Sequence, residues 1–245
     1  MTRSAGLLAV SLAVCAALWP AAALAQDISI SLGDGGSITA RSIQLILLIT
    51  VLGLAPGLII MITCFPFLVT VLAILRQAIG LQQSPPNMLI VSLALFLTYF
   101  VMEPVFQTAW SDGISPLMNE EIDAETAAQR AFAPFRAFMA ERVDPDTFAA
   151  LGDLRPEAPE IVTPEAPVSL LIPSFMLSEI SRAFQIGFLV FLPFLIIDLV
   201  VAAVLMSMGM MMVPPAIVSL PFKLAFFVVG NGWSLIANAL VRSYF

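Results

Sequence analysis

Apolar residues dominate this chain in four long runs, which short polar turns and one extended hydrophilic region separate. About 20 apolar residues suffice to cross a bilayer as a helix. Prolines and single charges interrupt the runs, so the pattern predicts broken helices and helical hairpins. The runs cover residues 43–75, 88–106, 186–206 and 216–241, and a shorter apolar stretch, 170–184, precedes the third.

The first run exceeds the length of one span. It extends from Ile43 to Leu75 and contains Pro56 and Pro66. It therefore predicts either one kinked span or a span followed by a second helix, ending at Arg76.

The third and fourth runs predict a helical hairpin, because only a short loop joins them. Pro193 and Pro221 lie inside these runs, and Pro214 and Pro215 follow the loop. We expect all four prolines to break helices. The sequence Gly-Asn-Gly at 230–232 predicts one more break.

The hairpin loop reads MSMGMMMVPP over residues 206–215. A loop that faces water is normally polar, whereas methionine side chains are apolar, flexible and able to repack around changing shapes. Gly209 permits a sharp backbone turn. On this pattern alone, the loop is either buried in protein or lipid, or a deformable seal that several copies form around a passage. Its methionines are Met206, Met208, Met210, Met211 and Met212.

The hydrophilic region, residues 111–169, carries twelve acidic residues and four arginines. We expect a helix capped by Asn119 and broken at Pro134, then a short helix to about Arg142. Residues 157–167 are rich in proline and glutamate, which predicts disorder. Because basic residues mark cytoplasmic loops, this acidic region belongs on the outer side of a membrane.

Composition places the chain among integral membrane proteins: 60% of its residues are hydrophobic and 11% are charged, with a mean hydropathy of +1.01. A soluble domain has about 25% charged residues. We therefore predict an all-α membrane protein with about four apolar helical segments, arranged as broken hairpins, and a hydrophilic helical loop between the second and third.

Several chemistries are not expected. The chain has no histidine and two cysteines, one of them in the N-terminal segment, so no metal cluster or disulfide is predicted. It has no phosphate-binding loop and no nucleophile–base pair, so neither a cofactor nor catalysis is expected. Its acidic balance argues against nucleic acid as a partner.

The N-terminus resembles a secretory signal peptide, with Arg3, an apolar stretch and then Ala23-Leu24-Ala25. Cleavage after Ala25 is expected, and an uncleaved first span is the alternative. The predicted organisation is a signal peptide at 1–25, a helical hairpin region at 26–110, the acidic loop at 111–169 and the C-terminal hairpin at 170–245.

Four charged residues lie within residues 170–241, which contain the last two runs, where charges are costly unless they face a partner or water. Asp198 and Lys223 both lie about 18–20 Å from the hairpin tip along a helix, which predicts an ion pair. Glu179 and Arg182 are three residues apart and can pair on one helix face. Alternatively, Glu179 meets Lys223 of a neighbouring copy.

The chain contains three long strings of note: TCFPFLVTVLAILRQAIGLQQSPPN (63–87), SLALFLTYFVMEPV (92–105) and LSEISRAFQIGFLVFLPFLIIDLVVAAVLMSMGMMMVPPAIVSLPFKLAFFVVGNGWSLIANALV (177–241). These strings, and more weakly PFRAFMAE (134–141), resemble the FliP family, membrane components of the flagellar type III protein export gate with relatives in virulence type III secretion.

This resemblance implies that several copies assemble with FliQ, FliR and FlhB in the bacterial inner membrane, at the flagellar basal body. It also implies that the methionine-rich loops meet as a gasket in a channel for unfolded protein cargo. A different class of function remains an alternative: an ion-coupled small-molecule transporter or channel that uses Asp198 and Glu103.

Overall fold

A computed structural model describes residues 38–81, 85–156, 159 and 161–245. The predicted signal peptide, with Ala23 and Ala25 at its cleavage site, lies outside these residues. The chain divides after Ile49 into two compact units. One helix crosses this boundary, and the remaining described residues belong to the second unit.

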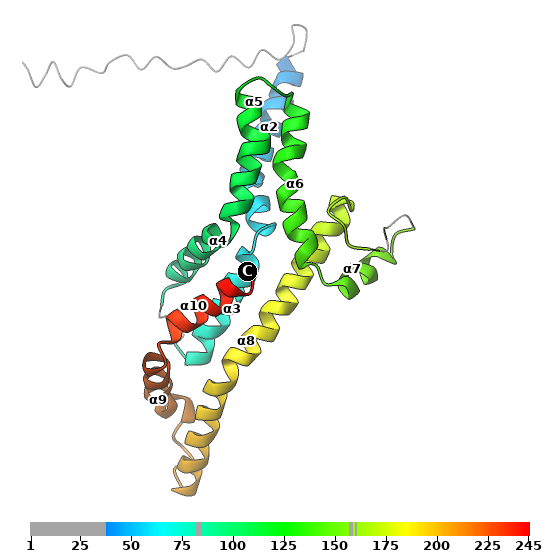
Figure 1. Ribbon diagram of the computed structural model, residues 1–245. Coiled ribbons are helices and arrows are strands. Elements are labelled where there is room, and N and C mark those ends of the chain that lie inside the picture. The colour runs from blue at the N-terminus through cyan, green and yellow to red at the C-terminus, as the bar shows by residue number, and fades with distance from the viewer. Residues whose placement is uncertain (1–37, 82–84, 157–158, 160) are drawn as a thin grey trace, which may run out of the picture. The chain divides into compact units, whose positions relative to one another are not determined.

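All regular secondary structure in the described residues is helical, which confirms the all-α prediction (Figure 1). The elements are α2 (Ile38–Met61), α3 (Phe65–Ile79), α4 (Asn87–Ala109), the π-helical η1 (Trp110–Ile114), α5 (Ser115–Met118), α6 (Ala124–Arg142), α7 (Pro145–Gly152), α8 (Val168–Ser207), α9 (Pro215–Val229) and α10 (Gly232–Arg242).

Three of the described helical stretches are long and apolar enough to cross a membrane: Ser42–Met61, Asn87–Met118 and α8. The bent pair α9 and α10 makes a fourth if the two helices form one span, in agreement with the four predicted segments. They meet at an angle of 62°. The bend occurs at the predicted Gly-Asn-Gly break, where Asn231 adopts a left-handed conformation with φ of 47° that asparagine tolerates better than most residues.

The first apolar run forms two helices. Pro56 lies inside α2, whereas Pro66 occupies the first turn of α3, where a missing backbone N–H costs little. The chain therefore contains a span followed by a second helix, one of the two predicted arrangements.

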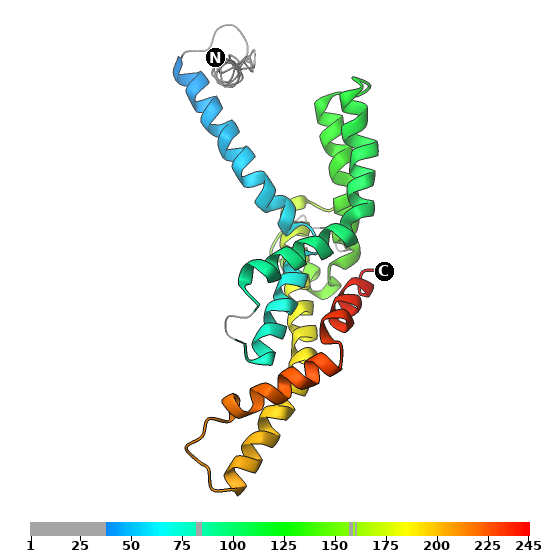
Figure 2. The ribbon, with the colours of Figure 1, turned by 90° about the vertical axis from the view of Figure 1, so that its left-hand side faces the viewer.

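Helix α3 is the centre of the hydrophobic core. It packs against α4, α8 and α9, and Figures 1 and 2 both show it beside α8. One of its faces is almost completely buried, because apolar residues recur there every three or four positions. The buried residues are Phe67, Leu68, Val71, Leu72, Leu75, Ala78 and Ile79.

The hydrophilic region forms a second layer of helices. Helix α6 packs against α4, η1 and α5, and both views show these helices running side by side (Figures 1 and 2). A second buried cluster joins the end of α6 and α7 to the start of α8; it includes Met139, Phe148, Leu171 and Phe175.

Two predictions for this region were wrong. Asn119 ends α5, whereas α6 begins after Asp123, whose carboxylate accepts hydrogen bonds from the backbone N–H groups of Glu125 and Thr126. Pro134 lies inside a continuous α6, because packing against neighbouring helices supports the helix on both sides of it. Of residues 157–167, which the composition predicts to be disordered, the structure describes 159 and 161–167, and there the Arg136 guanidinium donates to the carbonyls of Pro164 and Ala166.

Aspartates cap α6 and α7 in the hydrophilic region. Hydrogen bonds, first from the Thr126 side chain and then from its backbone, lower the pKa of Asp123. Thr147 lowers the pKa of Asp144 in the same way. A carboxyl whose pKa is depressed in the folded state stabilises the fold above its unfolded pKa, near 3.8. This contribution is lost as the pH falls through the folded pKa.

The expectation that Pro193 and Pro221 break helices was also wrong. Both lie inside continuous helices, α8 and α9. In an apolar helix, packing against neighbouring helices tolerates the lost hydrogen bond. Pro214 and Pro215 do separate two helices, since Pro214 caps α9 and Pro215 is its first residue.

Gly113 tests the contact between η1 and α6. A Cβ added to Gly113 would lie 2.6 Å from the backbone N of Ala131, so the substitution Gly113→Ala forces two backbones apart. We expect it to cost about 1–3 kcal/mol of unfolding free energy, as overpacking does. Thermal unfolding in detergent measures this loss.

Gly57→Ala in α2 is the matched control, because nothing lies within 4 Å of an added Cβ there. It should stabilise the helix by about 1 kcal/mol through helix propensity. Equal effects of the two substitutions would contradict the close contact.

Candidate functional site

The methionine loop has a defined backbone. Helix α8 ends at Ser207, and Gly209 follows with φ of 75°, a left-handed conformation that glycine adopts without strain. The Gly209 N–H donates to the Met206 carbonyl at 3.0 Å, and the Met210 N–H donates to the Leu205 carbonyl at 2.9 Å. These two bonds form a Schellman motif, which closes the end of α8. Pro214 and Pro215 then start α9, so the loop is held at both ends.

The methionine side chains of this loop are all exposed. Met211 and Met212 are 83% and 99% exposed. Met206, Met208 and Met210 are also exposed. The loop therefore combines a fixed backbone with five flexible thioethers.

An apolar groove of about 570 Å³ lies below the loop between α8 and α9. Met208 and Met210 form part of its lining, so the groove and the loop make one continuous apolar surface. Its other lining residues include Val201, Leu205, Val218 and Phe222.

Further along the hairpin, Asp198 and Lys223 form the ion pair that their spacing predicts. The Lys223 Nζ lies 2.6 Å from Asp198 Oδ2. The Ser219 hydroxyl donates to the other carboxylate oxygen at 2.5 Å. Both oxygens of Asp198 are thus hydrogen-bonded, and the pair joins α8 to α9.

Lys223 has a second role in the same position. Its ammonium donates to the Ala78 carbonyl at 3.1 Å, near the C-terminal end of α3, where helix carbonyls lack intrahelical partners and attract cations. The side chain of Lys223 is only 7% exposed and that of Asp198 is 30% exposed. Three helices therefore meet at one buried cation.

Glu179 is the centre of a second charged cluster. Its side chain is fully buried on α8, and Arg142, at the end of α6, donates to Oε1 at 3.0 Å. The Tyr244 hydroxyl donates to Oε2 at 2.5 Å. Arg142 also donates to the Ser243 carbonyl at 2.9 Å and lies over the Tyr244 ring, 4.1 Å from its centroid.

Arg182, the predicted partner of Glu179, lies farther from its carboxylate than Arg142 does. Arg182 lies 3.6 Å from the same oxygen and is 37% exposed, compared with 14% for Arg142. Sequence reasoning missed Arg142 and Tyr244, because they lie far from Glu179 in the chain. Lys223, the alternative partner in a neighbouring copy, is engaged here by Asp198 and Ala78.

Glu103 lies apart from the Asp198–Lys223 pair. It lies exposed on α4, where Gln107 donates to it at 3.1 Å, whereas Asp198 faces α9. The structure does not bring these two carboxylates into one site.

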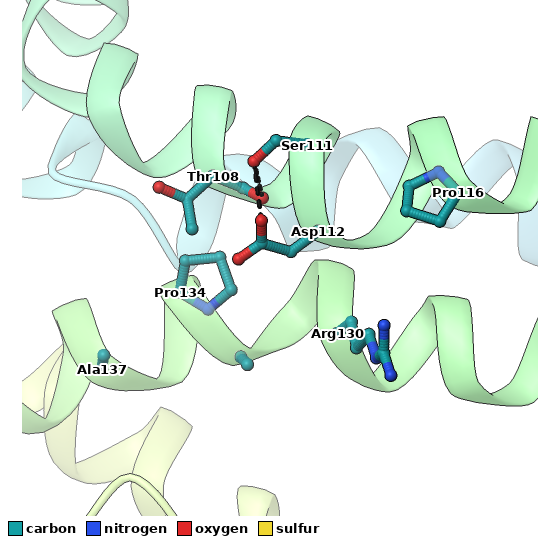
Figure 3. Close-up of a pocket in the computed structure, with 8 residues that line it drawn as sticks. Thr108, Ser111, Asp112, Pro116, Arg130, Pro134 and Ala137 are labelled. Atoms are coloured by element: carbon teal, nitrogen blue, oxygen red, sulfur yellow. Dashed lines mark hydrogen bonds between the residues drawn. The ribbon is translucent and has the colours of Figure 1, made fainter. Parts of the chain in front are cut away.

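A further groove of about 640 Å³ lies on the surface where α6 packs against the end of α4, η1 and α5 (Figure 3). Asp112 and Arg130 line it from opposite helices, and no ion pair joins them in the described residues. The Ser111 hydroxyl donates to Asp112 at 2.8 Å. The groove is open and its charged side chains are exposed, so it gives no chemistry beyond that of a solvated surface.

A profile of the FliP family matches residues 48–240, which contain the methionine loop, both oppositely charged pairs and all of the helices from α3 to α9. The chain belongs to the FliP family. This confirms the resemblance found in the sequence.

Several members of the FliP family are close relatives. A flagellar biosynthetic protein FliP of Caulobacter vibrioides is 50% identical over 243 residues, covering 99% of this chain and 91% of the relative. The FliP of Agrobacterium fabrum is 46% identical, covering 85% of this chain and 86% of the relative. The FliP of Bacillus subtilis is 43% identical, covering 84% of this chain and 93% of the relative.

The two arginines near Glu179 give a matched comparison. Arg142→Ala leaves a buried carboxylate without its main partner, and we expect a loss of about 3–5 kcal/mol of unfolding free energy. Arg182→Ala removes a distant and more exposed cation, and should cost less than about 1 kcal/mol. Thermal unfolding in detergent compares the two, and similar losses would contradict the assignment of Arg142 as the principal partner.

The Asp198–Lys223 pair is tested by removing each charge in turn. Asp198→Ala leaves the more buried Lys223 cation uncompensated, at a cost of about 3–5 kcal/mol, whereas Lys223→Met keeps an apolar stem and should cost less. The exchange Asp198→Lys with Lys223→Asp should recover part of the lost stability. Recovery stays partial because a carboxylate then faces the Ala78 carbonyl, and the absence of any recovery would argue against the pair.

Proposed function

We propose that this protein is a pore-forming structural subunit of the flagellar type III export gate. In this proposal it lies in the bacterial inner membrane at the flagellar basal body. Several copies assemble with FliQ-, FliR- and FlhB-type proteins, and the assembly passes unfolded protein cargo. The protein acts as a structural component and not as an enzyme. Membership of the FliP family supports the flagellar role, the location and the partners, and the geometry of the methionine loop supports the seal.

The observation that carries the proposal is the exposed methionine loop on a fixed turn. A single chain gains nothing from presenting five thioethers to its surroundings, because apolar side chains are stabilised when they are buried. Copies arranged around an axis would bury them against each other. In this arrangement the methionine side chains fill the passage, while the backbone of the loop keeps its conformation.

Methionine fits the cargo that such a gate must pass. Unfolded chains differ in sequence, so the lining should carry no fixed pattern of hydrogen bonds or charges. Thioether side chains have many rotamers and exchange their contacts easily. Between transport events, a dry apolar constriction blocks ions because water does not fill it.

The charged residues of the hairpin support the proposed seal, because they lie outside the methionine loop and form ion pairs within the chain. Asp198 and Lys223 hold α8, α9 and α3 together, and Glu179 holds α8 to the end of α6. These contacts fix the hairpin that presents the loop. An ion-coupled small-molecule transporter or channel that uses Asp198 and Glu103 would need them in one pathway, and they occupy separate sites.

The seal is tested by the combined substitution of Met210, Met211 and Met212 by Ala. Short side chains cannot fill the constriction, so we expect the purified assembly to conduct small ions when it is reconstituted in a planar bilayer. The unsubstituted assembly should stay closed.

Replacement of the same three residues by Leu is the control, because leucine preserves apolar volume. It should stay closed, and all variants should still purify as a complex with the partner proteins. An Ala variant that assembles but conducts no more than the unsubstituted complex would contradict the seal.

A further inference from the structure

We propose that the methionine loop is also a site of reversible oxidation, at which a hydroperoxide converts the apolar seal into a polar, leaky constriction. This inference rests on the proposed function, since it names a chemical control of the same seal. It follows from the clustering and the exposure of oxidisable side chains.

Thioethers are concentrated at one place in this protein. Five of the twelve methionines lie within residues 206–212. All five are exposed, whereas Met102 and Met139, in the two core clusters, are completely buried. The most exposed methionine in the described residues is Met212, at the tip of the loop.

The reaction needs only a small oxidant. A hydroperoxide transfers its terminal oxygen to the methionine sulfur: the O–O bond breaks, an S–O bond forms, sulfur loses two electrons and the peroxide is reduced. The proton of the transferred oxygen passes to the departing oxygen, so hydrogen peroxide leaves as water. Methionines at the faces of the seal contact the water on either side of it, so hydrogen peroxide reaches them without first crossing the dry constriction.

The cysteine of the described residues does not compete. Cys64 is buried at the start of α3. Burial raises the pKa of its thiol to about 12, so it stays protonated, and the thiol is a poor nucleophile compared with the thiolate.

Oxidation changes the property on which the seal depends. Methionine sulfoxide is polar, so it disrupts apolar interfaces that methionine forms. In the loop, several sulfoxide dipoles would stabilise water between the copies, and a wetted constriction no longer excludes ions. Methionine sulfoxide reductases, one for each sulfoxide epimer, reverse the change. The loop can therefore respond to oxidant and recover.

The experiment treats the purified, reconstituted complex with hydrogen peroxide. Peptide mass spectrometry should find added oxygen within residues 206–212 and none at Met102 or Met139. Ion conductance should rise with the extent of loop oxidation and fall after treatment with both classes of methionine sulfoxide reductase. Absence of sulfoxide in the loop would overturn the proposal, as would loop oxidation without a change in conductance.

A variant with all five loop methionines replaced by Leu is the matched control. It keeps apolar volume but cannot be oxidised there, and it retains the exposed Met88 and Met118 elsewhere in the chain. It should stay closed before and after peroxide. A peroxide-induced leak in this variant would place the sensitive group outside the loop and overturn the proposal.

The variant with Met210, Met211 and Met212 replaced by Ala, measured without peroxide, distinguishes failure of this inference from failure of the proposed function. If that variant conducts while the oxidised natural loop stays closed, the seal stands and its oxidative control fails. If that variant stays closed, the seal itself fails, and the oxidation proposal fails with it.

Discussion

Buried charge must be compensated, and this requirement determines how the helices of the protein are joined. Helix α8 carries two acidic side chains in otherwise apolar surroundings, Glu179 and Asp198. Each is matched by a cation from another helix, Arg142 from α6 and Lys223 from α9. In an apolar protein, hydrophobic contacts alone allow helices to slide past each other with little loss. The two charged contacts are directional, so they fix the register of α8 against its neighbours.

Lys223 shows how one residue satisfies several demands. It neutralises Asp198 and also binds a carbonyl at the end of α3, a short helix that is buried in the core. Because α3 is too short to cross a membrane by itself, its terminal carbonyls need partners inside the protein. The lysine supplies one, and so the hairpin that carries the methionine loop is attached to the most buried helix of the fold.

Sequence reasoning found the features that depend on local spacing. Asp198 and Lys223 lie at similar distances from a loop that was recognisable from its composition, so their pairing followed from helix geometry. It missed Arg142 as the partner of Glu179, because Arg142 lies in a region that looks like a solvated acidic loop and the contact joins residues far apart in the chain. It also overestimated the tendency of proline to break helices. Pro134, Pro193 and Pro221 lie within continuous helices, which packing against neighbouring helices maintains. Asp123 replaced Asn119 as a helix cap because its carboxylate reaches two backbone N–H groups, which composition does not reveal.

The length of α8 has a consequence for where this protein can sit. Forty helical residues extend over about 60 Å, whereas the hydrocarbon layer of a bilayer is about 30 Å thick. A helix of this length either runs at a steep slant or rises well clear of the lipid. In the second case, the apolar surface of α8 outside the bilayer would have to be covered by protein. Neighbouring subunits would then bury the side chains that acyl chains bury inside the bilayer.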